Sequence, residues 1–335
     1  MNPATTHWSD VLDSRLREVV PRGAAVALFD FPFHLNPGDL AIAAGELSWL
    51  ARNGSRVVSM TRRETVESGY WPEIPEGVIV LFQGGGNIGD LYPEHRLLFE
   101  QMLLRYPYHD VVMAPQSVNF RDPAEATELA ALLEKHRGQV TMLWRDTFSH
   151  NTASRLAPGA RHVLAPDAAA GFPGWQRLSS PVFDVTYLLR RDEEASARPP
   201  EVQTGSSDWP YSAADKIAWR AMLLGHHLLD RKPSATEARR RKLYGALATM
   251  VLRNCLRLLS TSDVVVTDRL HGHILSTLMG VPNVVLADSY GKVRNYYETW
   301  SREIPLTAFA SSWDEVPALV RRMQAAARSG QFAPE

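Results

Sequence analysis

Residues 264–273, VVVTDRLHGH, place an arginine and a histidine directly after an apolar run. The run predicts a buried strand, and a polar, non-helical loop after it presents Arg269 and His271 before a helix begins near Gly272. Ligands of open α/β sheets bind outside the carboxyl ends of strands, where a guanidinium can hold a phosphate or carboxylate. His271 can donate a proton there, because imidazole titrates near neutral pH. A structural pair of Arg269 with Asp268, with histidines capping the helix, explains the same residues equally well.

Residues 36–39, NPGD, lie between the first predicted strand and its helix. Gly38 allows a tight turn, and Asp39 can cap the free amide groups of the helix. Capping alone accounts for the motif. The alternative is that Asp39 faces a substrate hydroxyl, with Asn36 in the same pocket wall.

A glycine run, QGGGNIGD at residues 83–90, follows the apolar run GVIVLF. Residues 84–89 match G-x-G-x-x-G literally, but they follow the third strand and lack an acidic ribose partner at the expected distance, so dinucleotide binding is disfavoured. Consecutive glycines let backbone amides approach a ligand closely. We interpret Gly85, Gly86 and Asn87 as the wall of a sugar or phosphate pocket.

Two further cations occupy the ends of predicted strands. Arg145 follows the apolar run at residues 140–144, and Lys292 follows VVLAD at residues 284–288. Each of these alone is explained as a surface charge. Together with Arg269 around one cleft, they would suit a small ligand with three negative charges.

The elements that position these residues alternate between short apolar runs and amphipathic helical patterns. Such alternation predicts an α/β fold with parallel strands and crossover helices on both faces. We place a domain boundary after residue 165, giving domains of residues 1–165 and 166–335. Residues 192–208 are polar and predict a loop, and the final helix, near residues 313–327, packs on its own domain or back on the first one.

Composition excludes several classes of protein. The 335 residues are 45% hydrophobic and carry 36 basic and 37 acidic residues, a formal net charge of −1 that gives no reason to expect nucleic acid as a partner. Cys255 is the single cysteine and is expected to be a buried structural thiol. We find no signal peptide, transmembrane segment or metal-binding cluster, and expect a cytoplasmic protein. The basic stretch at residues 237–242, EARRRK, predicts a solvated helix face, with anionic-ligand or membrane-surface binding as the alternative.

The order of the motifs NPGD, QGGGNIGD, APQS, WRD, APD, TDRLHGH and GVPNVVLADSYGK, between residues 36 and 297, resembles the polysaccharide pyruvyltransferase family. The resemblance implies two Rossmann-like domains facing a cleft, an arrangement like that of B-type glycosyltransferases. It also implies transfer of pyruvate from phosphoenolpyruvate to two hydroxyls of a sugar, which forms a ketal and needs no cofactor or metal.

By this resemblance, Arg269 and Arg145 hold the donor's phosphate and carboxylate, and His271 is the acid–base residue. Asp39 is a candidate on the acceptor side, in residues 1–165, whereas the donor side lies in residues 166–335. We add Lys292 as a second phosphate contact. The alternatives are a nucleotide-sugar glycosyltransferase of the same fold and a non-catalytic saccharide-binding protein. The sequence leaves open whether the acceptor is lipid-linked, which would bring the protein to the inner membrane face, or a free saccharide.

Overall fold

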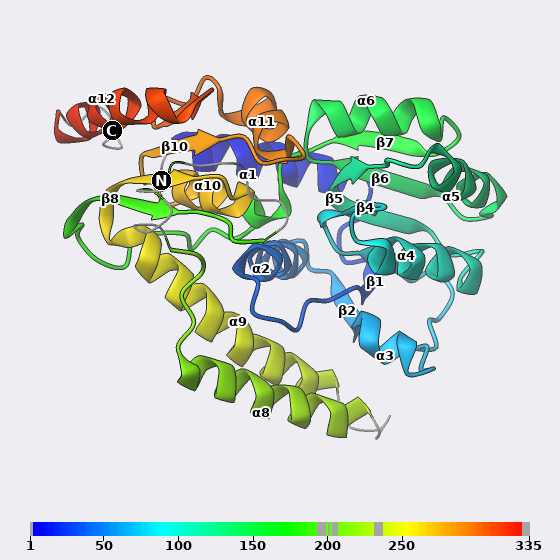
Figure 1. Ribbon diagram of the computed structural model, residues 1–335. Coiled ribbons are helices and arrows are strands. Elements are labelled where there is room, and N and C mark those ends of the chain that lie inside the picture. The colour runs from blue at the N-terminus through cyan, green and yellow to red at the C-terminus, as the bar shows by residue number, and fades with distance from the viewer. Residues whose placement is uncertain (1–2, 193–198, 200–201, 203–206, 231–236, 330–335) are drawn as a thin grey trace.

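The computed structural model describes residues 3–192, 199, 202, 207–230 and 237–329 (Figure 1). In that part of the chain, two parallel sheets are each covered by helices. The predicted α/β class with parallel sheets is confirmed.

The first sheet contains seven strands within the described residues, in the order β2-β1-β3-β5-β6-β7, with β4 paired to β5. Their bounds are β1 Ala25–Phe29, β2 Arg56–Thr61, β3 Ile79–Phe82, β4 Gly85–Gly89, β5 Val111–Asn119, β6 Val140–Trp144 and β7 Arg161–Leu164. Alternate residues of β1 enter different cores: Val26 and Leu28 lie in one cluster, Ala27 and Phe29 in the other. Burial on both faces explains why these strands are continuous apolar runs.

Apart from α1, which precedes β1, the helices of this half follow strands, as expected for crossover connections. They are α1 Pro3–Arg17, α2 Pro37–Arg52, α3 Arg63–Glu67, α4 Pro93–Arg105, α5 Pro123–Lys135 and α6 Thr147–Leu156. The helix α1 was not predicted, and it crosses to the other half, where it packs against α10 (Leu270–Leu278). Its Trp8 indole donates to the carbonyl of Trp300 at 3.3 Å. Figure 1 shows α1, in dark blue, beside α10 and β10.

The second sheet has the order β11-β10-β9-β8 among the described residues. Its bounds are β8 Phe183–Leu188, β9 Ser262–Thr267, β10 Asn283–Leu286 and β11 Thr307–Ala310. The short elements around it are the 3₁₀ segments η1 Ala168–Gly171 and η3 Trp313–Glu315, the helix α11 Lys292–Tyr296, and the π-helical turn η2 Tyr297–Ser301. The last helix, α12 Val316–Arg328, buries Val316, Val320 and Met323 against this second sheet. It therefore packs on its own half, rather than back on the first one.

Two long helices, α8 Ala213–Asp230 and α9 Glu237–Ser260, form a hairpin that projects from the rest of the molecule in Figure 1. The helix α9 also packs on α2 and β2 of the first half. All strands of the first sheet end by Leu164, and the second sheet begins at Phe183. The exact domain boundary remains a prediction, because η1, which lies between the sheets in sequence, packs on α2. Most of the predicted loop at residues 192–208 lies outside the described residues.

Candidate active site

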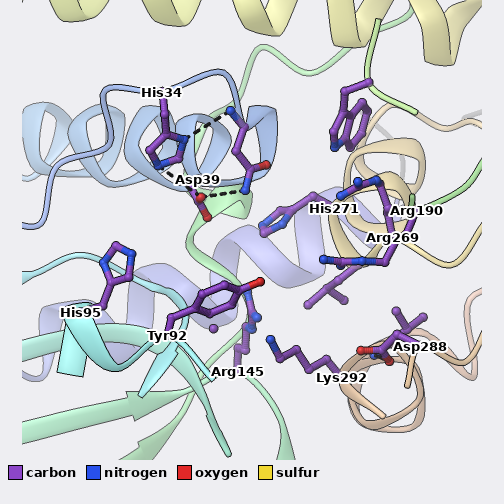
Figure 2. Close-up of a pocket in the computed structure, with 15 residues that line it drawn as sticks. His34, Asp39, Tyr92, His95, Arg145, Arg190, Arg269, His271, Asp288 and Lys292 are labelled. Atoms are coloured by element: carbon purple, nitrogen blue, oxygen red, sulfur yellow. Dashed lines mark hydrogen bonds and ion pairs between the residues drawn. The ribbon is translucent and has the colours of Figure 1, made fainter. Parts of the chain in front are cut away.

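A pocket of about 270 Å³ lies where the carboxyl ends of the two sets of strands meet. Figure 2 shows His34, Asp39 and His95 on one side of it, Arg190, Arg269 and Asp288 on the other, and His271 between them. Seven predicted site residues line the pocket: Asn36, Asp39, Gly86, Arg145, Arg269, His271 and Lys292. Eight further lining residues were not predicted: His34, Tyr92, His95, Arg190, Trp209, Leu270, Asp288 and Val293.

Arg145 is the most firmly held cation of the pocket. It follows β6 directly, and its side chain is 3% exposed. Its Nε donates to Ser117 Oγ at 2.8 Å, and its Nη1 donates to Asp167 Oδ2 at 2.9 Å. These bonds fix the guanidinium plane, so that Nη2 lies next to Gly86.

Asp167 is fully buried beneath the pocket, between Arg145 and His271. Its Oδ2 lies 3.4 Å from His271 Nε2, longer than an ordinary hydrogen bond, so we treat this contact as electrostatic. Burial raises the pKa of the Asp167 carboxyl, but His271 and Arg145 outweigh that effect and lower the pKa to about 2. Asp167 is therefore ionised at neutral pH and can stabilise positive charge on both neighbours.

His271 lies in the first turn of α10 and not in a non-helical loop, as the sequence suggested. The helix begins at Leu270, and Arg269 is its N-cap residue without a capping side-chain bond. The ring of His271 packs against Gly38 of α2, where an added Cβ would fall 2.7 Å from its Cγ. Gly38 thus makes room for the imidazole between the two halves, a role that its predicted tight turn does not describe.

Arg269 forms ion pairs across the mouth of the pocket. Its Nη2 lies 2.6 Å from Asp208 Oδ2 and 3.4 Å from Asp192 Oδ2, and its guanidinium lies over the ring of Trp209. The ion pairs given for Arg269 are thus with Asp208 and Asp192 rather than with Asp268, whose Oδ1 accepts from the backbone amide of Arg190 at 2.8 Å. Asp192 also pairs with the Arg190 side chain at 2.8 Å, so both arginines lie at the same edge.

The glycine run places backbone next to two cations. A Cβ on Gly86 would lie 2.9 Å from Arg145 Nη2 and 3.3 Å from Lys292 Nζ, so only glycine leaves both groups their positions. Gly85 begins the buried strand β4 and does not line the pocket, contrary to the prediction. The side chain of Asn87 lies outside the described part of the structure. We call Arg145, Arg190, Arg269 and Lys292 the cationic wall.

The opposite side, the polar wall, consists of His34, Asn36, Asp39 and His95. Asn36, and not Asp39, caps α2: its Oδ1 accepts from the Gly38 amide at 3.0 Å. Asp39 is instead free of capping duty and accepts from Asn36 Nδ2 at 2.7 Å, while His34 Nε2 lies 3.6 Å from the same carboxylate oxygen. The carboxylate of Asp39 is thus available at the pocket surface.

His95 is held from behind by a buried carboxylate. Its Nδ1 donates to Asp30 Oδ2 at 2.6 Å, which leaves Nε2 without this partner and able to face the pocket. Burial lowers the pKa of His95, but the bond to Asp30 outweighs that effect and raises it. Asp30 adopts φ of 62°, the single left-handed non-glycine residue in the described chain. Such strain is typical of functional sites.

No three His, Cys, Asp or Glu side chains in the described chain are grouped to hold a metal ion. In the same part of the chain, no helix combines the length and apolar character needed to cross a membrane.

The sequence profile of the polysaccharide pyruvyl transferase family matches residues 36–290 of this chain. The chain belongs to this family. It is 30% identical over 319 residues to the putative pyruvyl transferase EpsO of Bacillus subtilis strain 168, covering 91% of this chain and 95% of EpsO. It is 32% identical over 296 residues to pyruvyl transferase 1 of Schizosaccharomyces pombe, covering 82% and 69% of the two chains.

Among solved structures, an uncharacterised protein of Klebsiella pneumoniae superposes with a TM-score of 0.60 at 19% identity, covering 93% of this chain and all of that one. At this sequence identity, the likeness supports the fold of the chain and says nothing about its function.

Several site residues that the sequence analysis missed carry the same signal that identified Arg145. Four of them lie within three residues of the end of a strand: Asp30 after β1, Asp167 after β7, Arg190 after β8 and Asp288 after β10. The strand-end rule would therefore have found them. His34, Tyr92, His95 and Trp209 lie in loops or a helix, where no pattern distinguishes them from other polar or aromatic residues.

Proposed function

We propose that this chain transfers pyruvate from phosphoenolpyruvate to two hydroxyls of a saccharide, releasing phosphate and forming a ketal. The observation that supports this best is the convergence of Arg145, Arg269 and Lys292 with His271 on one pocket. Phosphoenolpyruvate carries a phosphate and a carboxylate on a three-carbon unit, so several cations at separate positions match its charge.

The cationic wall binds the donor. Arg145 and Arg269 present guanidinium groups that can each form paired hydrogen bonds to the phosphate or carboxylate. Lys292, which shares the space beside Gly86 with Arg145, adds a point charge for the phosphate. Because Arg145 is already fixed by Ser117 and Asp167, little reorganisation is needed when the donor binds.

His271 supplies the proton. Protonation of the terminal carbon of phosphoenolpyruvate makes its central carbon electrophilic, and a saccharide hydroxyl attacks that carbon. A second hydroxyl then displaces phosphate, whose negative charge the cationic wall stabilises. One of the two hydroxyl protons replaces the proton that His271 gave to carbon, and the other leaves on the phosphate. Asp167 holds the imidazole in place and stabilises its protonated form by its charge.

The polar wall receives the acceptor. Asp39 and His95 offer an accepting carboxylate and an imidazole to the two hydroxyls, and His34 and Asn36 complete that surface. Each can accept a proton or a hydrogen bond from an attacking hydroxyl. The pocket takes residues from both halves, which supports the proposed arrangement of two Rossmann-like domains facing a cleft. We further propose that the protein is cytoplasmic, needs no cofactor and uses phosphoenolpyruvate as co-substrate.

The experiment is calorimetric titration of the purified protein with phosphoenolpyruvate and, separately, with a panel of sugar nucleotides. We expect phosphoenolpyruvate to bind and sugar nucleotides to give no heat. Phosphate release should then depend on both phosphoenolpyruvate and an added saccharide. Release of nucleoside diphosphate instead would show a glycosyltransferase, and binding of saccharides without any turnover would show a saccharide-binding protein.

A further inference from the structure

The helix α9 carries a concentration of positive charge that the pocket does not use. Its residues, Glu237–Ser260, contain one acidic residue, Glu237, and six cations, Arg239, Arg240, Arg241, Lys242, Arg253 and Arg257, although the whole chain has a net charge of −1. A nearly neutral protein thus presents a strongly basic helix, and this asymmetry calls for an anionic partner.

The spacing of these cations places several of them on one solvent-facing stripe. Arg239, Lys242, Arg253 and Arg257 are exposed, and they are related by steps of three or four residues through exposed Ala246 and Thr249. Among the described residues, none forms an ion pair with Arg239, Lys242 or Arg253. The small residues between the cations let a flat surface approach the helix closely.

Exposed apolar side chains lie on the other helix of the hairpin. Ile217 and Leu224, two turns apart on α8, are 65% and 62% exposed. On the opposite flank of α9, a groove of about 500 Å³ has an apolar floor that includes Phe31 and Met60 and an exposed rim that includes Arg241. The hairpin therefore combines positive charge with apolar surface, as peripheral membrane-binding helices do.

We propose that the α8–α9 hairpin binds the surface of an anionic phospholipid bilayer. The cations of α9 attract the lipid head groups, and Ile217 and Leu224 enter the boundary between head groups and acyl chains. A nucleic acid would use the same cations, but it offers no environment for exposed aliphatic side chains. The bilayer therefore accounts for both features of the hairpin.

The hairpin is joined directly to the polar wall of the pocket. The Trp219 indole donates to the carbonyl of Phe33 at 3.2 Å, and the ring of Phe33 packs against those of His226 and Tyr244, both in the hairpin. Phe33 immediately precedes His34. A bilayer at the hairpin thus lies near the acceptor side, which, resting on the proposed function, favours a lipid-linked saccharide as acceptor.

The test is co-sedimentation of the full chain with vesicles of phosphatidylcholine alone and of equal parts phosphatidylcholine and phosphatidylglycerol. We expect binding to the anionic vesicles only, weakened by about 0.5 M salt. The triple variant Lys242→Gln, Arg253→Gln, Arg257→Gln should bind roughly 100-fold more weakly, since each surface cation contributes about a factor of five.

A matched control removes three exposed cations of α12, by Arg321→Gln, Arg322→Gln and Arg328→Gln, and should bind like the wild type. Equal weakening in both triple variants would overturn the proposal, because the effect would then be one of net charge. Wild-type binding to single-stranded DNA at least as tight as to anionic vesicles would also overturn it.

The apolar contribution is tested by Ile217→Ser with Leu224→Ser, which should weaken vesicle binding about 10-fold at constant charge. No change would contradict insertion of these side chains. Phosphate release with a soluble acceptor should be unchanged in the α9 triple variant. Loss of vesicle binding with intact turnover in the α9 triple variant tests the membrane proposal alone. Loss of turnover with intact vesicle binding in a pocket variant tests the proposed function alone.

Discussion

The two walls of the pocket differ in how firmly their side chains are held. On the cationic wall, Arg145 is 3% exposed and bonded to two neighbours. On the polar wall, the side chains of His34 and Asp39 keep 41% and 25% exposure and contact mainly each other and Asn36. A rigid wall suits one invariant small anion, whereas a more open wall can accommodate a larger and more variable partner. The difference supports a donor on the first wall and a saccharide on the second.

The strongest test of this comparison is Asp167→Asn. It removes the charge that lies between Arg145 and His271, while keeping the size of the side chain. We expect kcat to fall on the order of 10³-fold, as when a carboxylate that orients a catalytic histidine is neutralised. The measurement is phosphate release at saturating phosphoenolpyruvate and acceptor. A kcat within threefold of the wild type would mean that the rigid wall does not depend on this carboxylate.

The Asp167 carboxyl should also make the stability of the fold depend on pH. The folded-state pKa of Asp167, about 2, lies below its ordinary value of 3.8. Its contribution to stability is therefore complete above about pH 4 and is lost as the pH falls towards 2, by about 2 kcal/mol. Urea unfolding at pH 3 and pH 6 measures the unfolding free energies of the wild type and of Asp167→Asn. The difference between these two free energies should be smaller at pH 3 than at pH 6.

The second test asks whether the cationic wall holds the donor at its mouth. Arg269→Ala removes a guanidinium that is positioned by Asp208 and Trp209. We expect phosphoenolpyruvate to bind about 100-fold more weakly, since charge-assisted hydrogen bonds to an anion each contribute about 1.5–3 kcal/mol. Calorimetry gives the dissociation constant for phosphoenolpyruvate. The constant of Arg269→Lys should lie between those of the wild type and of Arg269→Ala. Unchanged donor binding would place the donor elsewhere.

The third test concerns the polar wall. His95→Gln breaks the pair with Asp30 and removes an imidazole from the acceptor side. We expect the KM for the saccharide to rise about 10-fold, the loss of roughly one hydrogen bond, with the KM for phosphoenolpyruvate within twofold of the wild type. Steady-state kinetics with each substrate varied in turn separates the two. A larger effect on phosphoenolpyruvate would remove the distinction between the walls.

The sequence predicted the parts of this molecule that depend on local pattern. Apolar runs located the strands, and the strand-end rule placed Arg145 at the carboxyl end of β6 in the first sheet and Arg269 just after β9 in the second. Contacts between distant segments could not be predicted. The packing of His271 on Gly38 and the crossing of α1 to α10 depend on how the two halves meet, and no local pattern encodes that.

The smallest effect on turnover is expected at Glu46, a second buried carboxylate near the site. Its Oε1 accepts from the Gly84 amide at 2.9 Å and so supports the glycine run, but burial raises its pKa to about 8. Asp167, equally buried, has cations beside it and the opposite shift. Pairing with cations, and not burial, therefore makes Asp167 suited to the site. Glu46→Gln, which keeps the accepting oxygen, should leave kcat within twofold.

Stability should change instead. The folded-state pKa of Glu46 lies above its ordinary value of 4.5. The contribution of Glu46 to stability is therefore complete below about pH 4.5 and is lost as the pH rises towards 8. The unfolding free energy of the wild type, relative to Glu46→Gln, should fall by about 1.4 kcal/mol per pH unit between pH 5 and pH 8. Urea unfolding at pH 6 and pH 8 measures the slope. If the unfolding free energies of the wild type and of Glu46→Gln differed by the same amount across this range, Glu46 would be ionised in the folded protein. The contrast with Asp167 would then rest on geometry alone.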